Sequence, residues 1–210
     1  MLRLITIQKR LLAAFGALAI LLAITGIFSV NSLSSVRTQA DIVETNILPA
    51  ISALGKVESL TAETRAMTLR LLLSLDITQE GATFNRIEDL GEQKNRASKE
   101  YEATISLQQE REVYKKFQEV DKQYYEYQQQ ALEFLKKEEL GAAQDLLDKM
   151  NPLSDQMVEL LKQLATINQT AATDARKASI STYDSARWAV IVLIIIAVVI
   201  AIVIAIMISR

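Results

Sequence analysis

The chain has 210 residues, of which 25 are acidic and 23 are basic, and it contains no cysteine and no histidine. Disulfide frameworks, thiol nucleophiles, zinc sites of the usual kind and histidine-based catalytic triads are therefore excluded. Only six glycines and two prolines interrupt a sequence that is 50% hydrophobic. Few helix breakers and no regularly spaced turn signals predict long helices, and so an all-α fold.

The charge is unevenly distributed along the sequence. Segment 31–187 carries all 25 acidic residues and 19 of the 23 basic ones, which gives it a formal charge of −6. The other four cations are Arg3, Lys9, Arg10 and Arg210. An acidic domain lacks the basic face that nucleic acids require, so we expect no nucleic-acid partner.

Two long runs without a charged residue lie near the ends of the chain, at residues 11–30 and 188–208. A helix rises about 1.5 Å per residue, so each run is long enough to cross a hydrocarbon core about 30 Å thick. A cleaved signal peptide is the alternative for the first run. Its length disfavours that alternative, and Ser29-Val30-Asn31 is not a small-x-small cleavage site. We therefore predict two transmembrane helices in a lipid bilayer.

The flanking charges predict the orientation of these two helices. Three cations precede the first run and Arg210 follows the second, so the positive-inside rule places both termini in the cytoplasm. The expected segments are a cytoplasmic N-terminus (1–10), transmembrane helix 1 (11–30), a domain outside the cytoplasm (31–187), transmembrane helix 2 (188–208) and the start of a cytoplasmic linker (209–210).

The outer domain begins with a helix whose apolar positions alternate in steps of three and four from Val36 to Leu75. This spacing is typical of a helix that packs on neighbours in a bundle. Pro49 lies inside it, removes one backbone donor and crowds the preceding turn, which predicts a kink near Asn46 rather than an end. Residues 76–81 are predicted to form the first turn.

Three further helices are predicted in this domain. The second spans about 83–107 and carries many charges, so it should be the most exposed, whereas the third spans about 110–137 with a regular apolar stripe. A short helical continuation at 141–150 leads to a fourth helix that starts at Pro152, since proline is tolerated in a first turn. The predicted fold is an antiparallel up-down-up-down four-helix bundle, with both transmembrane helices continuous with helices 1 and 4.

No catalytic arrangement is found in the sequence. Carboxylate pairs such as Glu138/Glu139 and Asp145/Asp148 lie on charged helix faces, where they are expected to be solvated. Clusters with metal-ligand spacing and glycine loops that bind phosphate are missing. We therefore expect no enzymatic activity, no metal and no cofactor.

Arginines on the first bundle helix are candidates for binding an anion. Arg65 and Arg70 are five residues apart, or about 140° around the helix, so one helix cannot direct both into one pocket. Two copies at a twofold dimer interface could each contribute one arginine, and Thr68 with the threonines before it would suit a close, polar seam. The alternative is that both arginines are exposed or pair with Glu58 and Glu63.

The predicted start of the fourth helix is a second candidate. Free backbone N–H groups and the positive end of the helix dipole would favour a carboxylate there, and Asn151 and Ser154 add polar groups. Ordinary helix capping is the alternative role of these two residues. The candidate ligand-binding residues are Arg65, Arg70, Thr68, Asn151 and Ser154.

Three stretches resemble the sensor half of bacterial methyl-accepting chemotaxis receptors, and the resemblance covers essentially the whole chain. The stretch NILPAISALGKVESLTAETRAMTLRLLL resembles the first helix of the family's periplasmic four-helix bundle, with its proline near the start and arginines near the end. The stretch KKEELGAAQDLLDKMNPLSDQMVELLKQLATINQ is similar to the turn between the third and fourth helices. The final residues IAIMISR resemble the end of the second membrane span, where a HAMP linker usually begins.

The resemblance implies a protein of the bacterial inner membrane whose segment 31–187 is a periplasmic or extracellular sensor domain. It also implies a homodimer that binds a small ligand and signals through a small slide of the fourth helix and the second transmembrane helix to a cytoplasmic module. In aspartate-type receptors three arginines hold the ligand across the dimer. Arg65 and Arg70 match the first two by spacing, whereas the third falls on Ser74, and Leu153 stands where a threonine is expected. These departures argue against an amino-acid ligand bound in that manner. A smaller or single-carboxylate anion, or no direct ligand, remains open.

Two other functions fit the same features. The module could feed a sensor histidine kinase or a cyclic-dinucleotide enzyme instead of a chemotaxis receptor. It could also be a membrane-anchored structural or partner-binding bundle without a small ligand.

Overall fold

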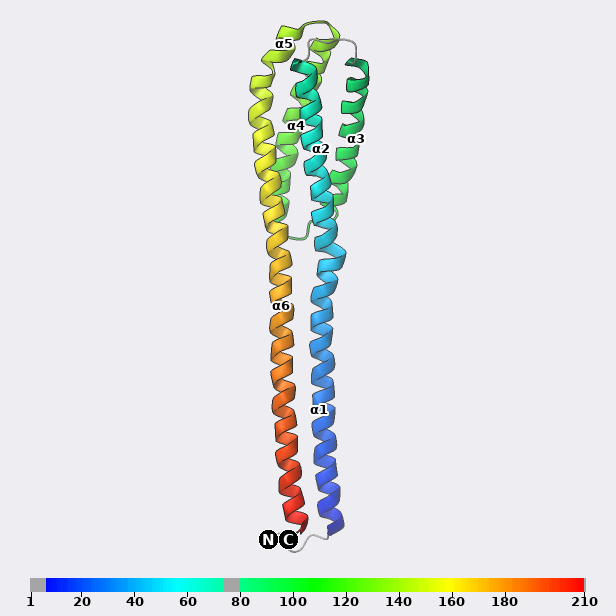
Figure 1. Ribbon diagram of the computed structural model, residues 1–210, viewed down its shortest axis with the longest axis vertical. Helices are drawn as coiled ribbons and strands as arrows, with labels where there is room; N and C mark the ends of the chain where they lie inside the picture. The colour runs from blue at the N-terminus through cyan, green and yellow to red at the C-terminus, as the bar shows by residue number, and fades with distance from the viewer. Residues whose placement is uncertain (1–6, 74–79, 210) are drawn as a thin grey trace. The chain divides into compact units, whose positions relative to one another are not determined.

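The computed structural model describes residues 7–73 and 80–209, and all regular secondary structure within them is helical (Figure 1). The chain forms two compact units. The first, called here the bundle unit, is Val43–Ala172, and the second, called the apolar-helix unit, consists of Met1–Ile42 and Thr173–Arg210.

Four long helices form the bundle unit: α2 (Leu48–Leu73), α3 (Glu80–Glu102), α4 (Gln108–Lys136) and the first part of α6 (Leu147–Ser209). Successive helices run in opposite directions (Figure 1), which confirms the predicted all-α, up-down-up-down bundle. Their apolar stripes meet in one core because each stripe repeats at helical spacing. The largest side chains with almost no exposure include Tyr101, Phe117, Leu72, Leu90, Met157 and Leu164.

The perturbation predicted near Asn46 takes the form of a π-helical turn, η2 (Val43–Ile47), directly before α2. Pro49 cannot donate to the preceding turn and its ring crowds the carbonyl there, so a wider turn relieves the clash. Asn46 Nδ2 donates a hydrogen bond to the carbonyl of Thr104 at 2.8 Å, in the connection between α3 and α4. The wide turn is therefore held by a partner far away in the sequence.

The limits of α3 differ from those predicted. The helix begins at Glu80, so residues 80 and 81 are helical rather than part of a turn, and the rest of the predicted first turn lies outside the described residues. It ends at Glu102 rather than at 107. Thr104 Oγ1 donates to the carbonyl of Tyr101 at 2.6 Å, and this local bond competes with the continuation of the helix.

The end of α4 is closed by a Schellman motif. The N–H of Glu139 donates to the carbonyl of Phe134, and the N–H of Glu138 donates to that of Leu135, both at 2.9 Å. Glu138 takes the left-handed conformation, with φ of 62°, at the position where glycine is usually found. The short helix α5 (Leu140–Asp145) follows.

The predicted start of the fourth helix at Pro152 is wrong, because α6 begins at Leu147 and contains Pro152 in its interior. Leu146 and Met150 are buried, and their packing holds the preceding turn in helical form. Pro152 itself is exposed, so the carbonyl that it leaves unpaired can bond to water. Asn151 and Ser154 consequently do not lie at the free N–H groups of a helix start.

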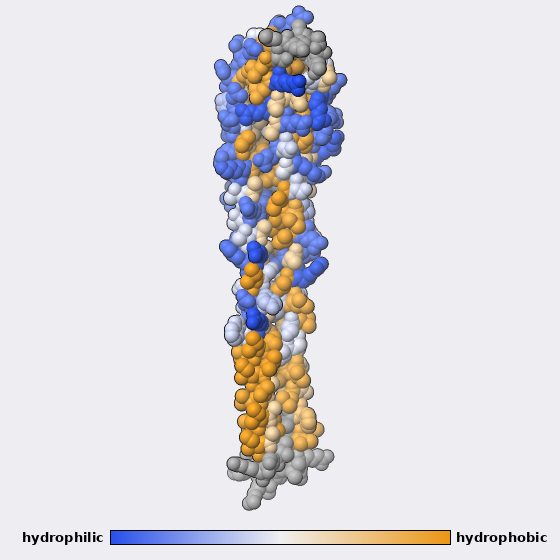
Figure 2. Space-filling model, in the orientation of Figure 1, coloured by the Kyte–Doolittle hydropathy of each residue, from blue (hydrophilic) through white to orange (hydrophobic). Residues whose placement is uncertain are grey.

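In the apolar-helix unit, α1 (Ile7–Ile42) and the last part of α6 expose large apolar side chains on several sides. Within the described residues, two helices are long and apolar enough to cross a membrane, and none of the residues in their most apolar windows is buried. Figure 2 shows the surface of these most apolar stretches as almost uniformly hydrophobic, in contrast to the charged surface of the bundle unit. Trp188, whose side chain is 67% exposed, lies at the start of the second apolar run.

Candidate ligand-binding site

Arg65 joins α2 to α6. Its Nη2 lies 3.6 Å from Oδ1 of Asp155, and the two side chains are 34% and 74% exposed. Asp155 follows Ser154, so the structure brings one candidate arginine to the part of α6 that the sequence had selected, although through a residue that was not predicted. Because the pair is largely in water, it stabilises the fold by less than about 1 kcal/mol.

One turn after Arg65 on α2, Thr68 is the centre of a buried polar group inside the bundle. Its side chain has no exposure; Thr68 Oγ1 donates to the carbonyl of Thr64 at 2.8 Å and accepts from Gln128 Nε2 at 2.6 Å. Burial raises the pKa of the neighbouring Tyr124 to about 12, an effect that the charge of Arg65 partly opposes. Thr68 therefore faces the interior of its own bundle, where the sequence had suggested an outward seam.

The other three candidates differ in their surroundings. Arg70 is exposed, and no ion pair of its guanidinium is found within the part of the chain that the structure describes. Asn151 is exposed on α6, whereas Ser154 is 2% exposed and belongs to the core. The five predicted residues thus form no single pocket within one chain.

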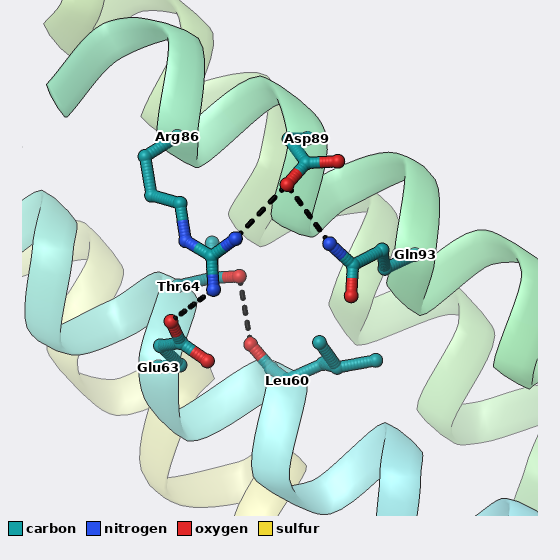
Figure 3. A network of polar contacts seen from close by, with 6 residues as sticks. All are labelled: Leu60, Glu63, Thr64, Arg86, Asp89 and Gln93. Carbon is teal, nitrogen blue, oxygen red and sulfur yellow. Dashed lines mark hydrogen bonds and ion pairs between the residues drawn. The ribbon is translucent and has the colours of Figure 1, made fainter. Parts of the chain in front are cut away.

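A polar network on α2 and α3 occupies Glu63, which was one of the alternative partners of the two arginines (Figure 3). Arg86 Nη2 lies 2.7 Å from Glu63 Oε1, and Arg86 Nη1 lies 3.0 Å from Asp89 Oδ2, which also accepts from Gln93. The bond to Glu63 is the main reason why the pKa of Arg86 is raised. Within the described residues, Glu63 therefore pairs with Arg86, and the exposure of Arg70 agrees with the alternative that this arginine is solvated.

A groove of about 980 Å³ lies between α3 and α4. Its floor includes Phe117 and Tyr114, and the ion pair between Lys94 Nζ and Asp121 Oδ1, at 2.5 Å, crosses it from one helix to the other. Burial raises the pKa of Tyr114 to about 12. The walls carry both acidic and basic side chains, so the groove has no clear preference for an anion.

The sequence also missed a buried carboxylate. Glu110, in the first turn of α4, is 2% exposed and accepts hydrogen bonds from Tyr101 and from Asn168 of α6. The signal was present: Glu110 and Asn168 both fall on the apolar stripes of their helices, where a polar residue is unusual. No group of three residues suited to hold a metal ion is found among the described positions.

The fold defines a helical bundle module with apolar flanking helices. A family profile described as "Four helix bundle sensory module for signal transduction" matches residues 4–183. Since the match covers most of the 210 residues, the chain belongs to this family. The resemblance to the sensor half of chemotaxis receptors is thereby confirmed, and the protein is a sensory module for signal transduction. A comparison with curated proteins finds no significant match.

Proposed function

We propose that the chain is the transmembrane input module of a bacterial chemoreceptor, and that it detects a small anion at a dimer interface. The family membership carries this proposal. The bundle supplies the sensor domain, the two apolar runs supply the spans, and the basic residues at both ends favour cytoplasmic termini. On this proposal the sensor domain is periplasmic and the module performs no enzymatic reaction.

The absence of native cysteine makes this topology directly testable. A Gln130→Cys variant, with an exposed position on α4, should react with a membrane-impermeant maleimide in intact cells, whereas Gln8→Cys should react only after permeabilisation. The opposite pattern would overturn the proposed orientation.

An exposed face of α2 supports the proposed dimer. Gly55, Ser59, Ala62 and Ala66 recur in steps of four and three and are all exposed. Small side chains at this spacing allow two helices to approach closely and to pack as a twofold pair. Arg70 lies about 40° around the helix from Ala66, so it would be near the seam between the two copies.

Arg65 is the residue that we propose to contact the anion. Its pair with Asp155 is long and exposed, so a ligand carboxylate can replace Asp155 at little cost. This exchange would loosen the contact between α2 and α6. A ligand that favours the loosened arrangement would shift the population towards it and displace α6, which is the proposed signal.

One observation favours a second function, a structural or partner-binding bundle without a small ligand. Arg65 already has an acidic partner and Thr68 is fully buried, so the ligand site is incomplete in a single chain. An input module of a sensor histidine kinase or a cyclic-dinucleotide enzyme would share every feature described for the chemoreceptor. The identity of the downstream cytoplasmic module decides between these outputs.

A thermal-shift screen of the whole chain in nanodiscs against small mono- and dicarboxylates tests the ligand proposal. A ligand should raise the midpoint by mass action, Arg65→Gln should abolish the shift, and Asp155→Asn should enlarge it because a competing carboxylate is gone. Arg96→Gln is the matched control, because Arg96 is also exposed and pairs with Glu92 at 3.6 Å. If no compound shifts the midpoint, or Arg65→Gln leaves the shift intact, the bundle without a small ligand is the better conclusion.

A further inference from the structure

Glu110 is a buried carboxylate that is surrounded by neutral donors. Tyr101 Oη and Asn168 Nδ2 each donate to its Oε1 at 2.8 Å, and the backbone N–H of Ser106 donates to its Oε2 at 3.4 Å. No ion pair of Glu110 is found within the described parts of the chain. Burying a carboxylate is costly unless it is hydrogen bonded, so these donors are required for the fold.

The same network extends to η2 on one side. Asn46 Nδ2 donates to the carbonyl of Thr104 at 2.8 Å, and Ser106 Oγ donates to Asn46 Oδ1 at 3.4 Å. Ser106 therefore contacts both Asn46, through its hydroxyl, and Glu110, through its N–H. The connection between α3 and α4 is fixed from both directions by these bonds.

On the other side the network reaches α6. Asn168 is 4% exposed, and its Nδ2 also lies 3.1 Å from the carbonyl of Leu164 and 3.3 Å from Tyr101 Oη. Burial raises the pKa of Tyr101 far above its ordinary value, and the bond to Glu110 adds to this effect. Tyr101 thus keeps its proton and remains a donor at any physiological pH.

In every hydrogen bond described for Glu110, its carboxylate is the acceptor. Both oxygens of the Glu110 side chain accept hydrogen bonds, Oε1 from Tyr101 and Asn168 and Oε2 from the N–H of Ser106. A π-helical turn contains one more residue than an α-helical turn, is rare, and is frequent at functional sites. The network therefore links the π-helical turn that precedes α2 with α6, through side chains and the backbone of the α3–α4 connection.

We propose that Glu110 is the centre of a polar relay, Asn46–Ser106–Glu110–Asn168, that couples the π-helical turn η2 to the position of α6. The relay contains residues from η2, the α3–α4 connection, α4 and α6. Its bonds are cooperative, since losing Asn168 leaves Glu110 short of a donor and loosens the connection that holds Asn46. The coupling needs no ligand, and only its use in signalling rests on the proposed function.

Hydrogen exchange of the whole chain in nanodiscs, followed by mass spectrometry of peptides from 40–48 and 164–172, tests the relay. Asn168→Leu should raise exchange in 43–47 by about tenfold, although residue 168 makes no direct bond to that turn. Coupling is reciprocal, so Asn46→Ala should raise exchange near residue 168. Tyr101→Phe, which keeps the ring and removes one donor, provides a milder variant that should give the same pattern if Asn168→Leu fails to fold.

Gln128→Leu is the matched control. Gln128 is 3% exposed and donates to Thr68 at 2.6 Å, so its loss also breaks a buried polar bond between helices. It should raise exchange around residues 64–72 and leave 43–47 within about twofold of the parent chain. Equal exchange at 43–47 in the control and the relay variants would mean general destabilisation and would overturn the relay. Unchanged exchange at 43–47 in both Asn168→Leu and Tyr101→Phe would overturn it as well.

This experiment is independent of ligand binding. Failure of the thermal-shift screen would leave the exchange pattern unaffected, and failure of the exchange pattern would leave the anion proposal at Arg65 standing. The two proposals are therefore separately falsifiable.

Discussion

Two polar groups at opposite ends of the bundle unit differ in their contact with water. The Arg65–Asp155 pair lies towards the α5 end, called here the open end, and is largely solvated, whereas Glu110 lies near residues 103–107, called here the closed end, and is buried. The Arg65–Asp155 pair, towards the α5 end, is 3.6 Å long and mostly exposed. Glu110, at the 103–107 end, is almost completely buried and accepts two bonds of 2.8 Å. Exposed groups can change partners at little cost, whereas buried groups cannot. The comparison suggests that the first region is suited to exchange partners with a ligand and the second to keep fixed ones.

The largest loss of stability is expected for a substitution next to Glu110, at the closed end. Asn168→Leu should lower the free energy of unfolding by about 2–3 kcal/mol, because a buried carboxylate loses a donor. Urea denaturation followed by circular dichroism measures the change. Arg65→Gln, at the open end, should cost less than about 1 kcal/mol. Similar losses for both variants would remove the difference between the two ends.

The next largest effect is expected on the pH dependence of stability, which should fall at alkaline pH because a buried tyrosine resists ionisation. Burial raises the pKa of Tyr124 from 10.0 to about 12, so its contribution to stability is complete below pH 10 and is lost as the pH rises to about 12. Two pKa units correspond to at most about 2.7 kcal/mol for this side chain. Thermal melts at pH 9 to 12 should therefore show a shallower alkaline decline in Tyr124→Phe.

The control for this pH dependence is Tyr125→Phe. Tyr125 is adjacent on α4 but 50% exposed, so it should leave the alkaline decline as it is in the parent chain. If Tyr125→Phe flattened the decline as much as Tyr124→Phe, burial would not be its cause.

A gain in stability is expected at the α5 end. Glu138 adopts φ of 62°, which costs an L-residue roughly 1 kcal/mol and costs glycine little. Glu138→Gly should therefore raise the free energy of unfolding by up to about 1 kcal/mol, as measured by thermal melting. Glu139→Gly is the matched control and should give no gain, because Glu139 has φ of −93°.

The smallest effect is expected for the exposed ion pair. Asp155→Asn should change the free energy of unfolding by less than about 0.5 kcal/mol, and added salt should reduce even this difference, since the charges are screened. Melts at low and high ionic strength would measure it. A loss above 1 kcal/mol would show that Asp155 is held as firmly as the groups at the closed end.

The fold could be predicted because helical periodicity depends only on neighbouring residues along the chain. The perturbation near Asn46 followed from Pro49 for the same reason. The predicted start of the fourth helix was wrong because proline is common in the first turn of a helix, whereas the burial of Leu146 and Met150 keeps the residues before Pro152 helical. Helix-boundary signals from neighbouring residues thus failed where packing against other helices determined the start of α6.

The candidate site was harder to predict than the fold. Arg65 and Arg70 were found from their charge and spacing, but no local pattern indicates that Arg65 pairs with Asp155 or that Glu63 bonds to Arg86. The partners of Glu110 are separated from it by up to 58 residues, and only the folded bundle brings them together. Side-chain pairing between helices depends on their rotation, which the apolar stripes define only approximately.

The single tryptophan has a practical consequence for optical spectroscopy. Trp188 lies in the apolar-helix unit, whereas the tyrosines at 101, 114, 124, 125 and 127 belong to the bundle unit, and only Tyr183 does not. Fluorescence excited at the red edge of the absorption band would therefore report the surroundings of residue 188 alone, and near-ultraviolet tyrosine signals would report mainly the bundle. Quenching by lipids brominated at different depths would place Trp188 in a bilayer without any introduced label.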